Sequence, residues 1–387
     1  MANINISALT EIIYGARDIV AKEPTGFIQS TTINSSKDGV SIGGTVTSMR
    51  GPAPTLNTSI TPSMTIPDGD AQTIAADTMT IGQTANTNIP LTGEQFKQLE
   101  NTTGYDEALA NIFANSIRVV RNAIEAHVAD VAYKGASRAF GTAATTPFAT
   151  TINNVFDVRK ILIDNGAPDD GRLSLVLDTT AGTALRQVPN LYKANEAGSD
   201  GLLRRGELMN LNGFSIKESS GIVTSTAGTM TGALINNGAG YAVGATSIVY
   251  DTGTTGATGI VTGDVITFAG DTNKYVVKTG PGAAASGTIV LQEPGLRSAK
   301  ADNVAITVVA THANNIAFHQ SAIELVVRPP SVPKGGDAAV ERFTIQDGTG
   351  LVYEIAQYKG YYKSLFDVTC YYQAKVWNPK YVGILLG

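Results

Sequence analysis

The chain has 387 residues, a formal net charge of -5 and only 16% charged residues. Its length allows two or three domains, and its acidic balance argues against a sequence-specific nucleic-acid reader, which normally carries a basic patch. The single cysteine, Cys370, excludes an intrachain disulfide, so we expect no dependence on an oxidising compartment.

The first predicted element is a short amphipathic helix that ends before Pro24. This N-terminal stretch lacks the basic head and apolar core of a secretory signal, and no apolar run in the chain approaches the roughly 20 residues that span a bilayer. From residue 25 to 48 the sequence is polar and extended. The apolar positions at helical spacing are Ile12, Ile13, Ala16, Ile19 and Val20.

Residues 50–90 are predicted to form long, two-sided strands whose flanks are neither charged nor strongly apolar. In "SITPSMTIPDGDAQTIAADTMTI" a turn signal, Pro67-Asp68-Gly69-Asp70, separates two runs rich in Thr, Ile and Met. A hairpin of this composition has little core of its own. Two interpretations remain open at this point, an arm that lies on a neighbouring subunit and an ordinary surface hairpin.

The strongest signal predicts a long helix from Tyr105 to Tyr133. Acidic residues 106 and 107 suit a helix N-terminus, and Gly135 is placed to end the helix. Its length would be about 45 Å, which is long for a globular enzyme and natural for a structural spine. The apolar residues recur at steps of three and four: Leu109, Phe113, Ile117, Val120, Ile124, Val128 and Val131.

Mixed α/β sequence follows this helix. A second helix is predicted from Asn153 to Asn165, a buried strand from Arg172 to Asp178, and a further helix to about Val188. The stretch "GELMNLNGFSIKESS" predicts a turn and a strand. These alternating elements indicate one α/β unit after the long helix.

Near Gly221 the composition changes to Gly, Thr and Ala, and it stays so to about Thr311. Short strand runs such as "TGDVITFAG" and "KYVVKTG" recur between turn signals, which predicts a small antiparallel barrel or sandwich. Because mixed α/β sequence flanks it on both sides, we interpret residues 221–311 as an inserted domain. The C-terminal tail is strand-like, and its many tyrosines suit an interface.

The sequence contains no convincing catalytic motif. Neither a phosphate-binding Gly-Lys loop nor a Gly-x-Ser-x-Gly elbow occurs. The tripeptide Asp251-Thr252-Gly253 matches the aspartic-protease motif, but those enzymes need two facing carboxylates, and Asp and Gly are turn formers. Asp169 and Asp170 are interpreted as a loop. An aspartic protease that uses Asp251 in a symmetric dimer is a remote alternative.

Metal ligands are equally scarce. The chain has three histidines, and His312 and His319 in "HANNIAFHQSAIELVVRPP" lie seven residues apart. They would share one face of a helix but point to opposite sides of a strand. We interpret both, and His127 on the long helix, as structural histidines. The sequence therefore predicts no enzyme, no cofactor and no metal site.

The order of these parts resembles the major capsid (coat) proteins of tailed phages with the Hong Kong 97-type fold, most closely the podovirus-like subgroup with an inserted β domain. Five segments carry the likeness: "IPLTGEQFKQL" before the long helix, "LNGFSIKES", "VTGDVITFAG", "NNIAFHQSAIELVVRPP" and the closing "FDVTCYYQAKVWNPKYVGIL". Together they span nearly the whole chain, and their order is more specific than any one of them.

The resemblance implies an α+β fold with the following divisions. Residues 1–48 would be an N-terminal arm and 49–75 an extended loop. Residues 76–149 would be a peripheral domain with a spine helix at 103–135, completed by C-terminal strands at 336–387. An axial domain would comprise 150–220 and a return at 312–335, interrupted by an inserted antiparallel β-barrel at 221–311.

The resemblance also implies a function. The protein would self-assemble through pentamers and hexamers into an icosahedral shell around phage double-stranded DNA, without sequence-specific DNA binding or a membrane. It would be made in the bacterial host cytoplasm and reside in the virion capsid. Its partners would be a separate scaffolding protein and a portal protein, and the binding of a decoration protein is left open. The implied assembly contacts are Ile12, Ile13, Ile19, Met64, Ile66, Pro67, Asp68, Gly69 and Asp70.

Two departures from the family pattern sharpen this expectation. Some relatives join their subunits through a lysine on the extended loop, but no lysine lies between Lys37 and Lys97, so we expect a non-covalent shell. Some relatives begin with a long scaffolding segment; this sequence begins close to the arm, so we expect a separate scaffolding protein. The alternative class is a β-rich tail-tube, surface-layer or adhesive protein, which shares the composition but does not explain the long helix.

Overall fold

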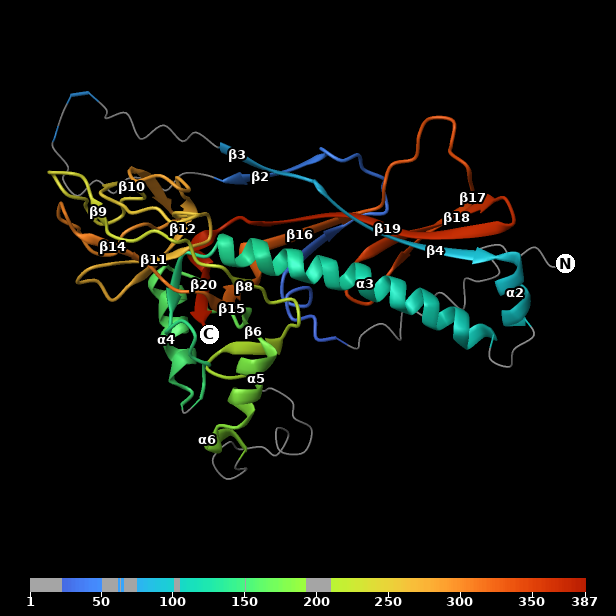
Figure 1. Ribbon diagram of the computed structural model, residues 1–387, viewed down its shortest axis with the longest axis horizontal. Helices are drawn as coiled ribbons and strands as arrows, with labels where there is room; N and C mark the ends of the chain where they lie inside the picture. The colour runs from blue at the N-terminus through green and yellow to red at the C-terminus, as the bar shows by residue number, and fades with distance from the viewer. Residues whose placement is uncertain are drawn as a thin grey trace.

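The computed structural model describes residues 23–50, 62, 64–65, 75–100, 105–149, 151–192 and 210–387. These residues combine helices with three β-sheets, and most strand pairs are antiparallel. The predicted mixture of helix and sheet in an α+β chain is therefore confirmed. Figure 1 shows a long helix lying along a long sheet, a strand-rich barrel at one end, and a smaller α/β unit below.

The long helix α3 (Tyr105–Lys134) lies almost where the sequence places it. Six of its seven predicted apolar positions are buried, from Leu109 to Val128, and Val131 is half-buried. Gly135 ends the helix as predicted, but it does not adopt the left-handed conformation of a typical glycine at a helix C-terminus. A Cβ atom there would lie 2.5 Å from Cγ2 of Val376, so the helix end needs glycine for close packing.

A six-stranded sheet packs against α3 and forms the larger core with it. Alternate residues of β4, including Ala85, Ile89 and Leu91, are buried, whereas Asn86 and Asn88 between them are exposed. The short helix α2 (Gly93–Glu100) connects β4 to the spine. The strands run in the order β1 (Thr32–Ser35), β16 (Ile323–Arg328), β19 (Lys363–Val376), β18 (Val352–Gly360) and β17 (Ala339–Gln346), and β4 (Gln83–Thr92) also pairs with β19.

A second core belongs to the α/β unit. Helix α4 (Asn153–Asp164) and the fully buried strand β6 (Leu173–Leu177) confirm the predicted helix and strand. Asp178 caps α5 (Thr179–Arg186) by accepting a hydrogen bond from the Thr180 N–H. The remaining elements of this unit are α6 (Pro189–Tyr192), β5 (Arg138–Phe140), β7 (Phe214–Glu218), β8 (Thr224–Ser225), β15 (His312–His319), β20 (Val382–Leu386) and the 3₁₀ turns η1 (Gln320–Ala322) and η2 (Pro379–Tyr381).

Between residues 221 and 311, six antiparallel strands close into a barrel with a core of its own. The barrel closes because β11 pairs with both β14 and β12. The strands, in their order around the barrel, are β11 (Val265–Phe268), β14 (Ala305–Val308), β9 (Ala233–Ile235), β10 (Ser247–Asp251), β13 (Gly287–Leu291) and β12 (Lys274–Thr279).

Strand pairing and side-chain contacts join the barrel to the rest of the molecule. Strand β12 also pairs with β5, so the barrel continues into the sheet of the α/β unit. The Gln292 side-chain amide donates to the Lys134 carbonyl at 2.7 Å, at the end of the long helix. Gly263 lies so close to the Tyr133 ring that a Cβ atom there would be 2.7 Å from it. Backbone pairing and side-chain contacts thus fix the barrel to the spine.

The described part of the predicted N-terminal arm is packed, whereas its polar sequence from residue 25 to 48 predicts an extended chain. Phe27 and Ile28 are buried, and Phe27 stacks on Phe318 with ring centroids 6.0 Å apart. Strand β1 then pairs in parallel with β16. Two apolar residues among polar neighbours are therefore enough to anchor this segment, because a preformed core surface receives them.

Candidate functional site

The carboxylates considered as catalytic candidates, Asp169, Asp170 and Asp251, lie in a loop and at the end of a strand. Asp251 ends strand β10, and Thr252 after it has φ of +55°, as expected of a turn. Asp169 pairs with Arg159 at 2.6 Å, whereas Asp170 contacts His319. The two neighbouring aspartates therefore serve different partners and do not form an acid pair.

The two histidines of β15 lie in separate structural environments. On a strand, residues seven apart face opposite sides. His312 is buried, with Nδ1 2.7 Å from the Ala310 carbonyl oxygen and Nε2 3.3 Å from Ser225 Oγ. Burial lowers the pKa of His312 below its ordinary value. A buried neutral imidazole with both nitrogens engaged matches the structural role expected from the sequence.

His319 lies between Asp170 and Ser321 in the order of a hydrolase triad. Its Nε2 is 2.9 Å from Asp170 Oδ1, and its Nδ1 is 2.8 Å from Ser321 Oγ. The same Nδ1 accepts the Ser321 backbone N–H at 3.3 Å, which caps η1. Ser321 thus belongs to the turn that the His319 side chain caps. These contacts form a local helix cap, in which Asp170 holds the His319 ring in place.

His127 is the third histidine and lies on α3. Its ring contacts Tyr372 edge-on at 5.4 Å, and burial lowers its pKa. Among the described residues, no group of three or more His, Cys, Asp or Glu side chains is placed to hold a metal ion. Nor is any described helix long and apolar enough to cross a membrane.

Of the predicted assembly residues, only Met64 lies within the described part of the chain, and it is fully exposed. The other eight lie outside it: Ile12, Ile13, Ile19, Ile66, Pro67, Asp68, Gly69 and Asp70. Strand β3 (Ala75–Thr80), within the second run of the predicted hairpin, pairs with β2 (Thr45–Arg50), which precedes that hairpin in the sequence, in register from Thr45↔Thr80 to Arg50↔Ala75. We call this pair of strands the stem.

This stem is anchored firmly to the sheet. Lys375 pairs with Asp77 and donates to the Thr78 carbonyl at 2.7 Å. Met79 and Ile81 are buried with Val326 and Trp377 in a small cluster of their own. The stem therefore has a fixed position, at the barrel end of the long sheet (Figure 1).

A buried carboxylate on α3 holds the N-terminal arm. Glu125 accepts hydrogen bonds from the backbone N–H groups of Phe27 at 2.8 Å and Ile28 at 2.9 Å, and from Ser219 Oγ at 2.6 Å. One turn earlier, Arg121 donates to Thr25 Oγ1 at 3.0 Å. Burial raises the pKa of Glu125, and the three hydrogen bonds offset this only in part. The arm, the spine and the chain leading into the barrel thus meet at one side chain.

At the opposite end of the long sheet, the turn between β18 and β19 carries two exposed tyrosines. Tyr361 is 87% exposed and Tyr362 78%, and their ring centroids are 4.4 Å apart. Tyr362 has φ of +51°, a left-handed conformation that tyrosine rarely adopts. Exposed aromatic rings on a strained turn are typical of a contact surface.

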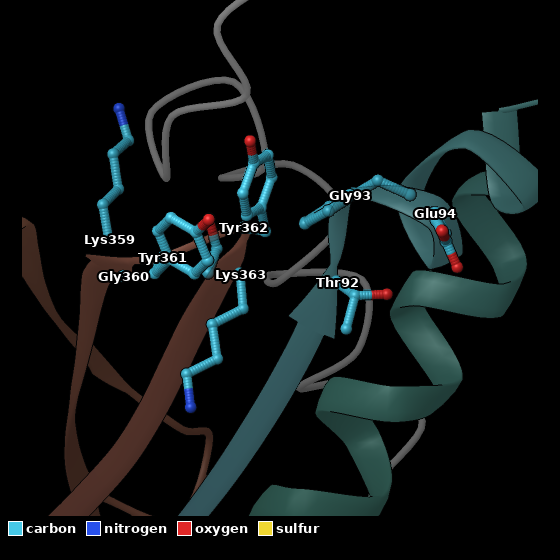
Figure 2. A pocket seen from close by; sticks show the side chains of 10 residues that line it. Thr92, Gly93, Glu94, Lys359, Gly360, Tyr361, Tyr362 and Lys363 are labelled. Atoms are coloured by element: carbon cyan, nitrogen blue, oxygen red, sulfur yellow. The ribbon is translucent and has the colours of Figure 1, made fainter.

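The same turn borders a cavity of about 680 Å³. Figure 2 shows the turn with Tyr361 and Tyr362 beside Thr92, Gly93 and Glu94, where β4 ends and α2 begins. Phe96 of α2 also lines the cavity. We call this surface, residues 92–96 and 359–364, the tyrosine tip. The tyrosine-rich tail indicated an interface, but the sequence did not single out Tyr361 and Tyr362.

No protein-family model matches the chain, and no curated protein matches it. Solved structures similar to it include the capsid of cyanophage P-SCSP1u, with 12% identity, a TM-score of 0.49 and coverage of 94% of this chain and 88% of that one. The mature capsid of bacteriophage PhiM1 gives 11% identity, a TM-score of 0.46 and coverage of 93% and 86%. A virus-like particle from Pyrococcus furiosus gives 6% identity, a TM-score of 0.41 and coverage of 98% of both chains.

Proposed function

We propose that this chain is the major capsid protein of a tailed phage. The observation that carries the proposal is the arrangement of its parts: a 30-residue helix along a long sheet, a hairpin anchored at one end and an exposed aromatic turn at the other. The order of sequence segments resembles the Hong Kong 97-type coat proteins in the same way. In this proposal the hairpin is the extended loop, α3 the spine and residues 221–311 the inserted domain.

The physical properties of the chain suit a shell. Contact surfaces at opposite ends of an elongated subunit favour head-to-tail packing, which closes into rings when the rotation between copies allows it. We infer that such rings are the pentamers and hexamers of an icosahedral shell. Many modest contacts, repeated by symmetry, stabilise such an assembly more than one strong contact does. A low charge content eases close packing of the subunits, and the net charge of -5 disfavours binding of the wall to enclosed DNA.

The proposal includes partners and a location. Assembly would take place in the bacterial cytoplasm with a separate scaffolding protein and a portal protein, and the mature chain would lie in the virion around double-stranded DNA. A decoration protein would bind the outside of such a shell, where one is present. These assignments follow from the resemblance. Each partner can be tested by asking whether it co-purifies with assembled particles.

We expect the shell to be non-covalent, because the sequence from residue 38 to residue 96 contains no lysine. The test is to express the chain with its neighbouring genes, isolate fast-sedimenting particles, and separate their boiled protein on a denaturing gel. The expected result is a single band at the 40.3 kDa of the monomer. A ladder of multiples of that mass would contradict the non-covalent shell, and the absence of particles would contradict the capsid function itself.

A further inference from the structure

A second cavity, of about 460 Å³, lies where the barrel meets the α/β unit (Figure 1). Its walls come from strands β5, β12 and β20, from the first turn of α4 and from the loop between β5 and α4. Among the described residues, no aspartate or glutamate lines this cavity, and Lys274 of β12 is the one charged side chain in its wall. The cavity therefore presents a positive charge, in a chain whose formal net charge is -5.

Lys274 has no acidic partner in the part of the chain that the structure describes. Its ammonium group donates to the Gly141 carbonyl, which leaves N–H donors for a further acceptor. Asp271, three residues earlier, pairs with Lys300 instead, at 2.8 Å. Lys274 is partly buried, and this desolvation lowers its pKa. An anion in the cavity would replace the lost hydration of the ammonium group and pair with its charge.

Neutral side chains supply further donors around Lys274. Five threonines and the Asn154 amide line the cavity, and none of these side chains forms a hydrogen bond with another described residue. The lining threonines are Thr142, Thr145, Thr146, Thr151 and Thr272. A hydroxyl group can donate to an anion and carries no charge that would repel it. The wall thus combines one cation with several neutral donors.

The start of α4 adds to this positive wall. Thr151 and Asn154 bring the first turn of the helix to the cavity. Ile152 at the N-cap position makes no side-chain cap hydrogen bond, and the first turn contains no acidic residue. The backbone N–H groups of a first helical turn have no partner within the helix, and the helix dipole makes them partly positive. The helix end therefore favours a negative group in the cavity, as Lys274 does.

We propose that this cavity binds a phosphate group, held by the Lys274 ammonium, the threonine hydroxyls and the first turn of α4. Phosphate fits this arrangement better than a carboxylate, because its tetrahedral oxygens can accept hydrogen bonds from several walls at once, whereas a carboxylate has its two oxygens in one plane. We expect free phosphate and not the backbone of DNA, because the acidic chain repels a duplex. This inference does not depend on shell formation, because every residue behind it belongs to one subunit.

The first test titrates unassembled full-length protein with inorganic phosphate at constant ionic strength and follows binding by phosphorus NMR. We expect saturable binding, and Lys274→Met should weaken it by about tenfold or more, because a charge-assisted hydrogen bond is lost. Lys278 is exposed on the same strand, outside the cavity, so Lys278→Met is the matched control and should leave the affinity unchanged. Absence of saturable binding, or equal affinities for wild type and Lys274→Met, would overturn the proposal.

A second pair of variants excludes misfolding as the cause of lost binding. Asn154→Asp places a carboxylate in the cavity wall, and the start of a helix favours an acidic residue. We therefore expect the thermal unfolding midpoint to be kept while the phosphate affinity falls by about tenfold. Asn153→Asp adds the same charge at an exposed neighbour that does not line the cavity, and it should weaken binding much less. Equal losses from both variants would indicate general repulsion and overturn the proposed site.

A short DNA duplex, added at the same concentration of phosphate groups, identifies the source of the phosphate. We expect no binding of the duplex that depends on Lys274. Duplex binding that Lys274→Met abolishes would overturn free phosphate as the ligand and assign the site to the DNA backbone. Particle formation, scored separately on the same variants, reports on the capsid function and not on this site.

Discussion

Replacing Glu125 with alanine is expected to lower the free energy of unfolding of the subunit by about 3–5 kcal/mol. The side chain is 1% exposed and accepts hydrogen bonds from Phe27, Ile28 and Ser219. Its removal leaves three buried donors without their acceptor and opens the contact between arm and spine. Urea denaturation of unassembled full-length protein measures the loss, and amide exchange at Phe27 and Ile28 should accelerate with it.

Two further variants define the cause of this loss. Glu125→Gln keeps the shape and one acceptor oxygen but turns an amide N–H₂ toward one of the donors, so we expect an intermediate loss. Asp130→Ala removes an acid from the same helix, where Asp130 pairs with Lys134 at 2.8 Å near the surface. This change should cost less than about 0.5 kcal/mol. A Glu125→Ala loss no larger than that of Asp130→Ala would show that Glu125 does not anchor the arm.

Replacing Asp271 with alanine is expected to destabilise the barrel by about 3–5 kcal/mol. Asp271 and Lys300 form an ion pair at 2.8 Å, with side chains only 3% and 6% exposed. Tyr275 and Ser298 also donate to Asp271 Oδ2, at 2.8 and 2.9 Å. Loss of the carboxylate leaves the Lys300 ammonium buried with no acidic partner. Thermal unfolding of the full-length variant measures the effect.

The double variant Asp271→Ala with Lys300→Met tests the pairing. Because it removes both charges, its loss should be smaller than the sum of the two single losses by about 1–3 kcal/mol. Lys380→Ala, which breaks the exposed pair with Glu293 at 3.7 Å, is the control and should cost less than about 1 kcal/mol. Additive single losses would mean that the two charges do not stabilise each other.

The pH dependence of this pair follows from its geometry. Burial raises the pKa of Asp271, but hydrogen bonds from Lys300, Asn273 and Tyr275 outweigh this and hold the pKa well below its ordinary value. A depressed carboxyl pKa in the folded state stabilises the fold above the unfolded pKa of about 3.9. The contribution is lost as the pH falls below that value, so the stability difference between wild type and Asp271→Ala should shrink in acid.

Helical periodicity was the most reliable guide to this fold. The long helix and α4 followed from apolar residues repeating every three or four positions, whereas β6 followed from a short continuous apolar run. The sequence around His312 and His319 alternates poorly, since β15 is buried along both faces and β16 follows after only one turn. Periodicity cannot identify a strand that lacks a polar face.

The contacts that organise the molecule were harder to predict, because they join residues far apart in the sequence. Nothing local marks Glu125 as the acceptor for the N–H groups of Phe27 and Ile28, nearly 100 residues earlier. The three-residue strand β5 is too short to carry a pattern, yet it connects the barrel to the α/β unit. The tyrosine tip depends on which turn stays exposed, and only the folded chain determines that.

The most direct test of the proposed function is electron cryo-microscopy of the protein produced with its neighbouring genes. We expect closed icosahedral shells built of pentamers and hexamers, with density for each subunit that accommodates the 30-residue helix, the long sheet and the barrel. Uniform tubes or flat lattices would instead place the chain among tail-tube or surface-layer proteins. Monomers under all conditions of expression would contradict the assembly function altogether.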